Sequence, residues 1–373
     1  MPNVLTIVPY PFLPPKLGGQ KNIAFFYAFF APLVKLTCVT TKNNELENVG
    51  GYELLKILSR NRSRYFNLFY FFTLRNIIRQ KKISHLLIEH PYYGWLGVLL
   101  KSFCGVKLIV RSQNIESIRF KSIGKWWWKI LWYYERFTHR KAHLNFFIQE
   151  DDLNYGIQQF GLSAEKCFVI TYGFEMTHAP TREERNFARE RIGETYGIQP
   201  DEKILLFNGA LNYKPNLDAV DSILEKINPL LDSRKDYKYR IIICGSKLPA
   251  EYQGLVNYQK KHIIYAGFVD DISLFYKGAD IFINPVIEGG GIKTKVVEAL
   301  GHDLSVVSTG SGAVGIPVGI TGGKMKVVKD QDWISFTEEI TSMDTSTAIP
   351  AAYFDHFYWG NIAARAAELI NHL

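Results

Sequence analysis

The sequence predicts an α/β protein made of two Rossmann-like domains. Short runs rich in β-branched residues alternate with longer helix-compatible segments throughout the 373 residues, and this alternation is typical of βαβ units with parallel strands. The charge also changes along the chain, because residues 1–180 hold 23 Lys or Arg and 11 Asp or Glu, whereas residues 181–373 hold 21 and 25. Net charges of +12 and −4 indicate two domains with different roles.

Each expected strand ends at a Gly, Pro or Asn turn, and a helix-compatible stretch follows it. The strands are expected, in order, at 4–9, 36–40, 85–89, 107–111, 145–149, 167–171, 203–208, 239–244, 263–267, 281–284 and 305–308. A highly charged stretch separates the sixth strand from the seventh and places the domain boundary near 175–200. We therefore predict an N-terminal domain over 1–178, a second domain over 179–355, and a terminal helix over 356–373 that packs back on the N-terminal domain.

The composition excludes several classes of protein. Hydrophobic residues make up 47% and charged residues 21%, which is typical of a globular chain large enough to bury its core without disulfides. The four cysteines lie far apart and form no CxxC pair, which argues against a zinc site and favours a reducing compartment. The N-terminus resembles a strand rather than a signal peptide, and no apolar run reaches the roughly 18 residues that span a bilayer. These observations predict a cytoplasmic protein.

Two segments of the first half, 60–82 and 119–134, are both basic and aromatic. One interpretation is a set of helices whose aromatic faces are buried and whose Lys and Arg side chains are solvated. A second is a patch on an anionic membrane surface, with Trp and Tyr at the level of the headgroups, which would place the protein peripherally at the inner face of the cytoplasmic membrane. A nucleic-acid partner is not expected, because no nucleic-acid module pattern accompanies the segments.

The segment 281–300 has the pattern of a phosphate-binding loop. An expected strand ends at Asn284, three glycines follow at 289–291, and a helix-compatible stretch comes next. Glycines allow close approach of the backbone to a ligand, and a helix N-terminus offers unpaired N–H groups and positive potential. Lys293 and Lys295 in the first turn would face an anion, and Glu298 could accept hydrogen bonds from a ribose. The alternative is a glycine turn before an amphipathic helix that carries a Lys295–Glu298 surface pair.

Together with other segments, this pattern resembles the GT-B glycosyltransferases of the family 4-like group (glycosyl transferases group 1), of the bacterial polysaccharide and glycolipid type. The resemblance is carried by 208–220, 243–246, 265–271, 289–298 and 305–315. It implies two Rossmann-like domains that face each other across a cleft, with a nucleotide-diphosphate sugar as donor and a saccharide or lipid-linked saccharide as acceptor. It also implies retention of the anomeric configuration. No cofactor or metal is expected, because lysines and a helix end can stabilise the leaving diphosphate.

The resemblance assigns roles to individual residues. The predicted donor-binding residues are Gly19, Gly209, Lys214, Val269, Glu288, Gly290, Gly291, Ile292, Lys293, Thr294, Lys295 and Glu298. The predicted acceptor-binding residues are Gly18, His90, Gln113, Asn114 and Glu116. The predicted catalytic residues are Lys295, Glu298 and His90. The DxD triplet at 330–332 lies past the donor motif and is expected to be a surface turn.

The sequence departs from the family pattern at two positions. Gly290 stands where much of the family has a glutamate that contacts the donor sugar, with Glu288 close by, and Gln113 stands where a His-Asn-x-Glu pattern has its histidine. These departures leave open a catalytically degenerate nucleotide-sugar-binding protein as an alternative. A nucleotide-sugar 2-epimerase is a further alternative, although no clear carboxylate–histidine set accompanies it. A dehydrogenase is disfavoured, because no GxGxxG follows the first strand.

Overall fold

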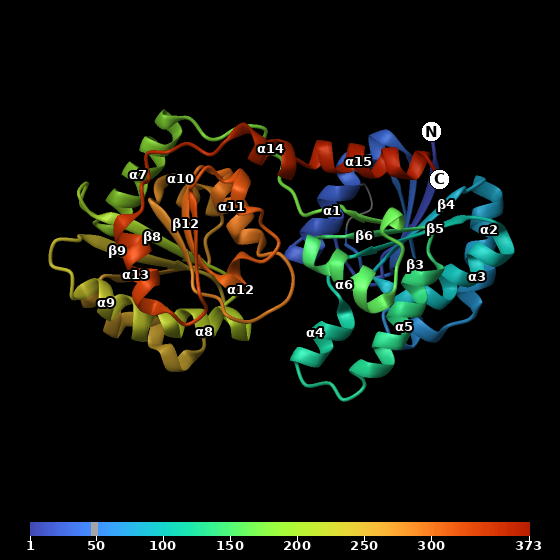
Figure 1. The fold of residues 1–373 in the computed structure, drawn as a ribbon, viewed down its shortest axis with the longest axis horizontal. Coiled ribbons are helices and arrows are strands. Elements are labelled where there is room, and N and C mark those ends of the chain that lie inside the picture. The colour runs from blue at the N-terminus through green and yellow to red at the C-terminus, as the bar shows by residue number, and fades with distance from the viewer. Residues whose placement is uncertain (46–50) are drawn as a thin grey trace. The chain divides into compact units, whose positions relative to one another are not determined.

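A computed structural model describes residues 1–45 and 51–373 of the chain (Figure 1). The chain divides into two compact units, of which unit 1 comprises Met1–Glu175 with His356–Leu373 and unit 2 comprises Met176–Asp355. Each unit contains a fully parallel sheet with helices, as an alternation of strands and helices requires. In the described residues no helix is long and apolar enough to cross a membrane.

Unit 1 contains a seven-stranded sheet in the order β3-β2-β1-β4-β5-β6-β7. Its strands are β1 Asn3–Ile7, β2 Lys35–Thr41, β3 Glu53–Leu58, β4 His85–Glu89, β5 Lys107–Ser112, β6 Leu144–Phe147 and β7 Cys167–Val169. Its helices are α1 Gly18–Phe30, η1 Ala31–Leu33, η2 Arg62–Phe66, α2 Phe69–Lys81, η3 Pro91–Tyr93, α3 Gly94–Cys104, α4 Glu116–Ser122, α5 Trp128–Lys141, α6 Glu150–Phe160, η4 Ala164–Lys166 and α15 Trp359–Asn371. Strand order reverses between β1 and β4, which pair from Val4↔His85 to Ile7↔Ile88.

Unit 2 contains a six-stranded sheet in the order β10-β9-β8-β11-β12-β13, which reverses between β8 and β11. Its strands are β8 Lys203–Asn208, β9 Tyr239–Cys244, β10 Ile263–Gly267, β11 Ile281–Asn284, β12 Ser305–Thr309 and β13 Met325–Val328. Its helical segments are α7 Arg182–Tyr196, α8 Lys214–Ser222, η5 Ile223–Ile227, α9 Asn228–Asp232, η6 Ala250–Lys261, α10 Ile272–Gly278, α11 Thr294–Gly301, α12 Gly310–Ala313, η7 Val318–Ile320, α13 Trp333–Ser342 and α14 Ala351–Phe357.

The expected strands are all present, and two further strands lie where none was expected. These are β3 and β13, each at an edge of its sheet. An edge strand is covered on fewer sides than a central one, so its residues need not form a continuous apolar run. In β13 only the first and last residues are buried, since Met325 and Val328 are buried while Lys326 and Val327 between them are exposed. The central strands, buried on both faces, have the continuous apolar runs from which they were predicted.

The last helix completes the core of unit 1. Trp359 at the start of α15 is fully buried, with its ring 6.4 Å from that of Phe26 in α1 and 5.5 Å from that of Tyr172. The backbone N–H of Phe174 donates to the carbonyl of Phe357, and the N–H of Trp359 donates to the carbonyl of Phe174, so two distant parts of the chain are joined. Figure 1 shows α15 running beside α1. Two separate stretches of chain therefore build one unit.

Candidate active site

The glycine segment of unit 2 follows β11, next to the point where the strand order reverses. Ligands of open α/β sheets bind at such switch points, outside the carboxyl ends of the strands. The Asn284 side chain fixes the end of β11 by donating to Ser308 Oγ at 3.0 Å and to the Gly312 carbonyl at 3.1 Å. Gly289 and Gly291 have φ values of 97° and 73°, a backbone conformation that favours glycine. Of the other predicted donor residues here, Gly290 is exposed, whereas Ile292 and Thr294 are half-buried.

Lys293 immediately precedes α11 and folds back over the glycine segment. Its ammonium donates to the carbonyls of Gly289 at 2.8 Å and Gly291 at 2.9 Å. Burial lowers the pKa of Lys293 to about 8, because carbonyl dipoles replace the lost hydration only in part. The side chain therefore holds the loop through hydrogen bonds that a stronger acceptor, such as a phosphate, could displace.

The Lys295 ammonium points toward the end of β8, in the second position of α11. It donates to the Asn208 carbonyl and to Asn216 Oδ1, each at 3.1 Å, and lies 4.1 Å from the centre of the Phe207 ring. Burial, followed by the charge of Lys293, lowers the pKa of Lys295 to about 7. These contacts differ from the solvated Lys295–Glu298 pair that the alternative interpretation required. The ammonium is instead fixed inside the unit, beside the loop.

The glycine segment and the loop from β8 to α8 lie side by side. A Cβ atom on Gly289 would come within 3.1 Å of Tyr213 Oη, and one on Gly209 would come within 2.6 Å of Asn216 Nδ2. Gly209 is therefore needed where the Asn216 side chain turns toward Lys295. Residues 208–216 and 289–295 thus form one cluster at the switch point between β8 and β11.

The other predicted donor residues range from exposed to half-buried. Lys214, the first residue of α8, pairs with Asp218 at 2.5 Å, and its side chain is 74% exposed. The hydrogen bond that its ammonium donates to that carboxylate raises the pKa of Lys214. Glu288 is exposed, and Val269 and Glu298 are half-buried, with Glu298 one turn beyond Lys295 in α11. The ligand-binding roles of these residues stay predictions.

The DxD triplet is a pair of helix and turn caps. Asp330 accepts from the backbone N–H of Ser311 at 2.9 Å and from its hydroxyl at 2.5 Å. Asp332 accepts from the N–H of Ser335 at 3.1 Å and thereby caps the start of α13. Both carboxylates have structural partners, as the expected turn implies.

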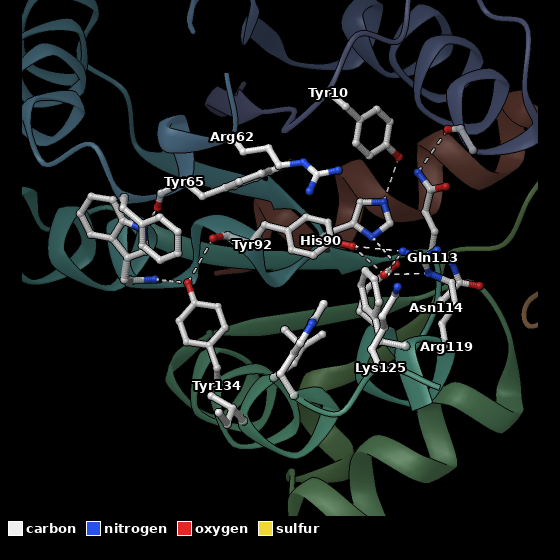
Figure 2. A pocket seen from close by; sticks show the side chains of 18 residues that line it. Tyr10, Arg62, Tyr65, His90, Tyr92, Gln113, Asn114, Arg119, Lys125 and Tyr134 are labelled. Carbon is white, nitrogen blue, oxygen red and sulfur yellow. Dashed lines mark hydrogen bonds and ion pairs between the residues drawn. The ribbon is translucent and has the colours of Figure 1, made fainter. Parts of the chain in front are cut away.

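Unit 1 contains a pocket of about 1010 Å³ at its own switch point, between β1 and β4 (Figure 2). Side chains that follow β1, β4 and β5 form its floor, and η2, α3, α4 and α5 form its walls. The lining residues are Tyr10, Gly19, Arg62, Tyr65, Phe66, His90, Tyr92, Trp95, Gln113, Asn114, Glu116, Arg119, Phe120, Lys125, Trp127, Ile130, Leu131 and Tyr134. Aromatic rings dominate this set.

His90 follows β4 directly and is held on both sides of its ring. Its backbone has a φ of 62°, and its N–H donates to the Arg111 carbonyl at 2.8 Å. Nδ1 lies 3.1 Å from Glu116 Oε1, and Nε2 lies 2.9 Å from Tyr10 Oη. The two ring nitrogens therefore face Glu116 on one side and Tyr10 on the other.

Glu116 lines the pocket beside His90. It is 1% exposed, and its Oε2 accepts from Tyr92 Oη at 2.6 Å and from Arg119 Nε at 2.9 Å. Burial by itself would raise its pKa, but the hydrogen bond and charge of His90, the charge of Arg119 and the Tyr92 hydroxyl outweigh it and lower the pKa to about 2. Glu116 thus lines the pocket with its carboxylate already engaged by several partners, and its predicted acceptor-binding role stays a prediction.

A second buried carboxylate holds the start of α4. Glu135 in α5 accepts from the backbone N–H groups of Glu116 and Ser117, each at 2.9 Å, and so satisfies two amides at the start of this helix. Burial raises the pKa of Glu135 to about 7, although these hydrogen bonds oppose the shift. The position of α4, and with it one wall of the pocket, depends on this contact.

The other predicted acceptor residues lie near the start of α1. Gly19, Gln113 and Asn114 line the pocket, whereas Gly18 is outside the lining set. Gln113 Nε2 donates to the Gly19 carbonyl at 3.3 Å, and a Cβ on Gly19 would lie 3.0 Å from Gln113 Oε1. Gln113, at the position of the family's histidine, therefore ties the end of β5 to the first turn of α1.

Sequence reasoning missed most of the pocket walls. Tyr10 lies three residues beyond β1, while Arg62, Tyr65, Lys125 and Trp127 come from the two basic aromatic segments. The sequence predicts these segments to be buried helix faces or a membrane patch, and the structure adds that part of each lines the pocket. Their unusual composition was the available signal, but it did not show that the two segments meet.

Two family models match the chain, one in each unit. The model described as "Glycosyl transferases group 1" matches residues 202–344, and the model described as "Glycosyltransferase Family 4" matches residues 34–177. An uncharacterized 44.6 kDa protein in the cps region of Klebsiella pneumoniae is 25% identical over 284 residues, which is 72% of this chain and 67% of that protein. An uncharacterized glycosyltransferase of Methanocaldococcus jannaschii is 29% identical over 160 residues, covering 40% of this chain and 34% of that relative.

Solved structures share the fold across the whole chain. A sucrose-phosphate synthase from Thermosynechococcus elongatus has a TM-score of 0.73 at 12% identity, covering 100% of this chain and 99% of the other. Anabaena HepE in complex with UDP has a TM-score of 0.70 at 11% identity, with 100% of both chains covered. WaaG, described as a glycosyltransferase involved in lipopolysaccharide biosynthesis, has a TM-score of 0.68 at 13% identity, covering 98% of this chain and 99% of that one.

The two parallel sheets, with a candidate site at the switch point of each, define an α/β protein with the GT-B fold. The chain belongs to the group 1 and family 4 glycosyltransferases and is therefore a glycosyltransferase. The sequence-based predictions of fold class, family and enzyme class are thereby confirmed.

Proposed function

We propose that this glycosyltransferase moves a sugar from a nucleotide-diphosphate sugar to a saccharide or lipid-linked saccharide in the synthesis of a cell-surface polysaccharide or glycolipid. The observation that carries the donor half of the proposal is the cluster of residues 208–216 and 289–295, where two ammonium groups lie at the start of α11. The relative in the cps region of Klebsiella pneumoniae and the likeness to WaaG support the polysaccharide or glycolipid context. The likeness to HepE, which binds UDP-glucose, supports the nucleotide-sugar donor.

In the proposed reaction the leaving diphosphate gains negative charge as its bond to the anomeric carbon breaks. Fixed positive groups lower that barrier, because they need no reorganisation when the charge develops. Lys295 and the first amides of α11 would hold the diphosphate, and Lys293 would join them by leaving the carbonyls of Gly289 and Gly291. Glu298 would hold the ribose hydroxyls. Because ammonium groups supply the positive charge, the proposed mechanism uses no metal and no cofactor.

The acceptor would occupy the pocket of unit 1, with its reacting hydroxyl near Tyr10. The Tyr10 hydroxyl is oriented by His90, and His90 in turn by Glu116. This chain of contacts would position the hydroxyl of the acceptor, and the catalytic role predicted for His90 stays a prediction. We propose retention of the anomeric configuration on the strength of the family resemblance.

The donor site is tested by nucleotide binding to the wild-type protein and to Glu298→Ala. In a thermal-shift panel with UDP, GDP, ADP, CDP and dTDP, one nucleotide at about 100 times its Kd is expected to stabilise the wild type by about 2.7 kcal/mol. The stabilisation is expected to be lost in Glu298→Ala because the ribose contact is removed. Glu338→Ala, an exposed glutamate in α13 of the same unit, is the matched control. A nucleotide effect that survives in Glu298→Ala would contradict the ribose assignment, and a flat panel would contradict the donor site.

We also propose that unit 1 binds peripherally to an anionic membrane surface. Phe69 and Phe72 of α2 are 76% and 57% exposed, and Phe103 of α3 is 66% exposed. Phe72 and Phe103 lie on either side of Phe71, whose ring is 5.4 Å from that of Phe72 and 5.6 Å from that of Phe103. Exposed cations of the same segment, among them Arg79 and Lys82, would add about 1 kcal/mol each near anionic lipid.

Co-sedimentation with liposomes tests the membrane proposal. The bound fraction is expected to rise with the content of anionic lipid and to fall at least threefold in the double variant Phe69→Ser with Phe72→Ser, because less apolar area can enter the headgroup region. Phe187→Ser in α7 of unit 2, which removes a ring that is 61% exposed, is the control and is expected to bind like the wild type. Binding that is independent of anionic lipid would contradict the proposal.

A further inference from the structure

We infer that the pocket of unit 1 selects a saccharide that carries an acidic group, a phosphate or a carboxylate. The inference rests on the proposed function, since it treats this pocket as the acceptor site, and it names the chemical class of the acceptor. Two features carry it. The pocket is lined by aromatic rings, and two cations that line it have no anionic partner among the described residues.

The charge of the pocket is unbalanced. Arg62 begins η2, and Lys125 lies between α4 and α5, so the two cations come from separate parts of the chain. Figure 2 shows them on opposite sides of the His90 and Tyr92 rings. Over residues 1–45 and 51–373, no carboxylate pairs with either side chain.

The carboxylate that lines the pocket is already neutralised. Glu116 accepts from Arg119 at 2.7 Å and pairs with His90 at 3.1 Å, and it is 2% exposed at the side chain. It therefore leaves the charges of Arg62 and Lys125 uncompensated. Two like charges that face one concave site raise the local potential, which attracts an anion of suitable size.

The rest of the lining suits a sugar ring. Tyr65, Tyr92, Trp95 and Tyr134 offer apolar faces, and their polar atoms are anchored. Trp95 Nε1 donates to the Tyr65 carbonyl at 2.8 Å, and Tyr134 Oη lies 3.0 Å from the Trp95 backbone N–H. Rigid aromatic faces with few polar groups fix a ligand that is apolar on one side and polar on its edges. The planar guanidinium of Arg62 matches the paired oxygens of a phosphate or carboxylate.

The ligand class is tested by binding in the absence of any nucleotide sugar. Isothermal titration of the full chain would use four probes: α-glucose 1-phosphate, methyl β-glucuronide, neutral methyl β-glucoside and inorganic phosphate. At least one acidic saccharide is expected to bind tenfold or more tightly than both the neutral glycoside and phosphate alone. The first two probes separate a phosphate-bearing acceptor from a carboxylate-bearing one.

A charge-matched pair of double variants shows whether the effect is local. Arg62→Gln with Lys125→Gln is expected to weaken binding of the acidic saccharide at least tenfold. Arg60→Gln with Lys121→Gln removes the same charge from two exposed positions outside the lining set and is expected to change binding by less than twofold. Equal losses in the two variants, or equal binding of neutral and acidic glycosides, would overturn the inference.

The nucleotide panel tests the proposed donor site independently of the proposed acceptor class. The variant Arg62→Gln with Lys125→Gln is expected to keep the full thermal shift with nucleotide, because both substitutions lie in unit 1. A wild-type protein that shows the nucleotide shift and no preference for acidic saccharides would refute the acceptor class alone. A protein that selects the acidic saccharide and shows no nucleotide shift would instead refute the proposed donor site.

Discussion

Replacing Lys295 by alanine is expected to lower kcat/KM for sugar transfer by about 10²–10³-fold. The ammonium is fixed by Asn208 and Asn216 inside unit 2, so in the proposed reaction it would face the leaving diphosphate without reorganisation, and removing one such preorganised donor has an effect of this size. The measurement is the initial rate of nucleotide release from the donor that the panel identifies, with Lys226→Ala at an exposed position as control.

The dependence of nucleotide affinity on pH separates the charge of Lys295 from its packing. Burial lowers the pKa of Lys295 to about 7 and that of Lys293 to about 8, so both amines lose their protons as the pH rises from 7 to 9. A diphosphate binds the protonated amines better, so its affinity is expected to fall across this range. In Lys295→Arg, whose guanidinium stays charged, the fall is expected to be shallower. A full rate in Lys295→Ala, or an affinity that rises from pH 7 to 9, would contradict the assignment.

Replacing Trp359 by alanine is expected to destabilise unit 1 by about 3–5 kcal/mol, the cost of removing a fully buried aromatic side chain. The ring packs against Phe26 and Tyr172, and a Cβ on Gly173 would lie 2.9 Å from it, so little room exists for neighbouring side chains to fill the cavity. Urea unfolding followed by circular dichroism measures the loss.

Trp126→Ala is the matched control for that experiment. Its side chain is 82% exposed, so its removal is expected to change the free energy of unfolding by no more than about 0.5 kcal/mol. Equal stability of the Trp359→Ala and Trp126→Ala proteins would show that α15 contributes little to the core of unit 1.

The fold was largely predictable because the central strands are buried on both faces. Runs such as 204–207 and 241–244 are apolar at nearly every position, and this pattern depends on burial alone. The edge strands β3 and β13 were missed for the same reason, since partial burial leaves a mixed pattern. The glycine segment was predictable because its three glycines and the helix-compatible stretch after them are visible in the sequence.

The geometry of the two sites depended on contacts between distant segments. The direction of the Lys295 side chain is set by Asn208 and Asn216, which lie 87 and 79 residues away in the sequence, so periodicity within α11 does not predict it. Likewise, the pocket of unit 1 forms where residues after β1 meet η2 and the segment between α4 and α5. The residue types were visible in the basic aromatic segments, but their convergence was not.

The interleaving of the two units has a consequence for synthesis of the protein. All of unit 2 is translated before the residues of α15, which unit 1 needs to cover Phe26 and Tyr172. During synthesis, the first 175 residues therefore emerge with an apolar surface uncovered, while unit 2, a continuous stretch of chain, can fold. Partly folded nascent chains that expose apolar surface are prone to aggregate. Unit 1 is thus completed last, although its synthesis begins first.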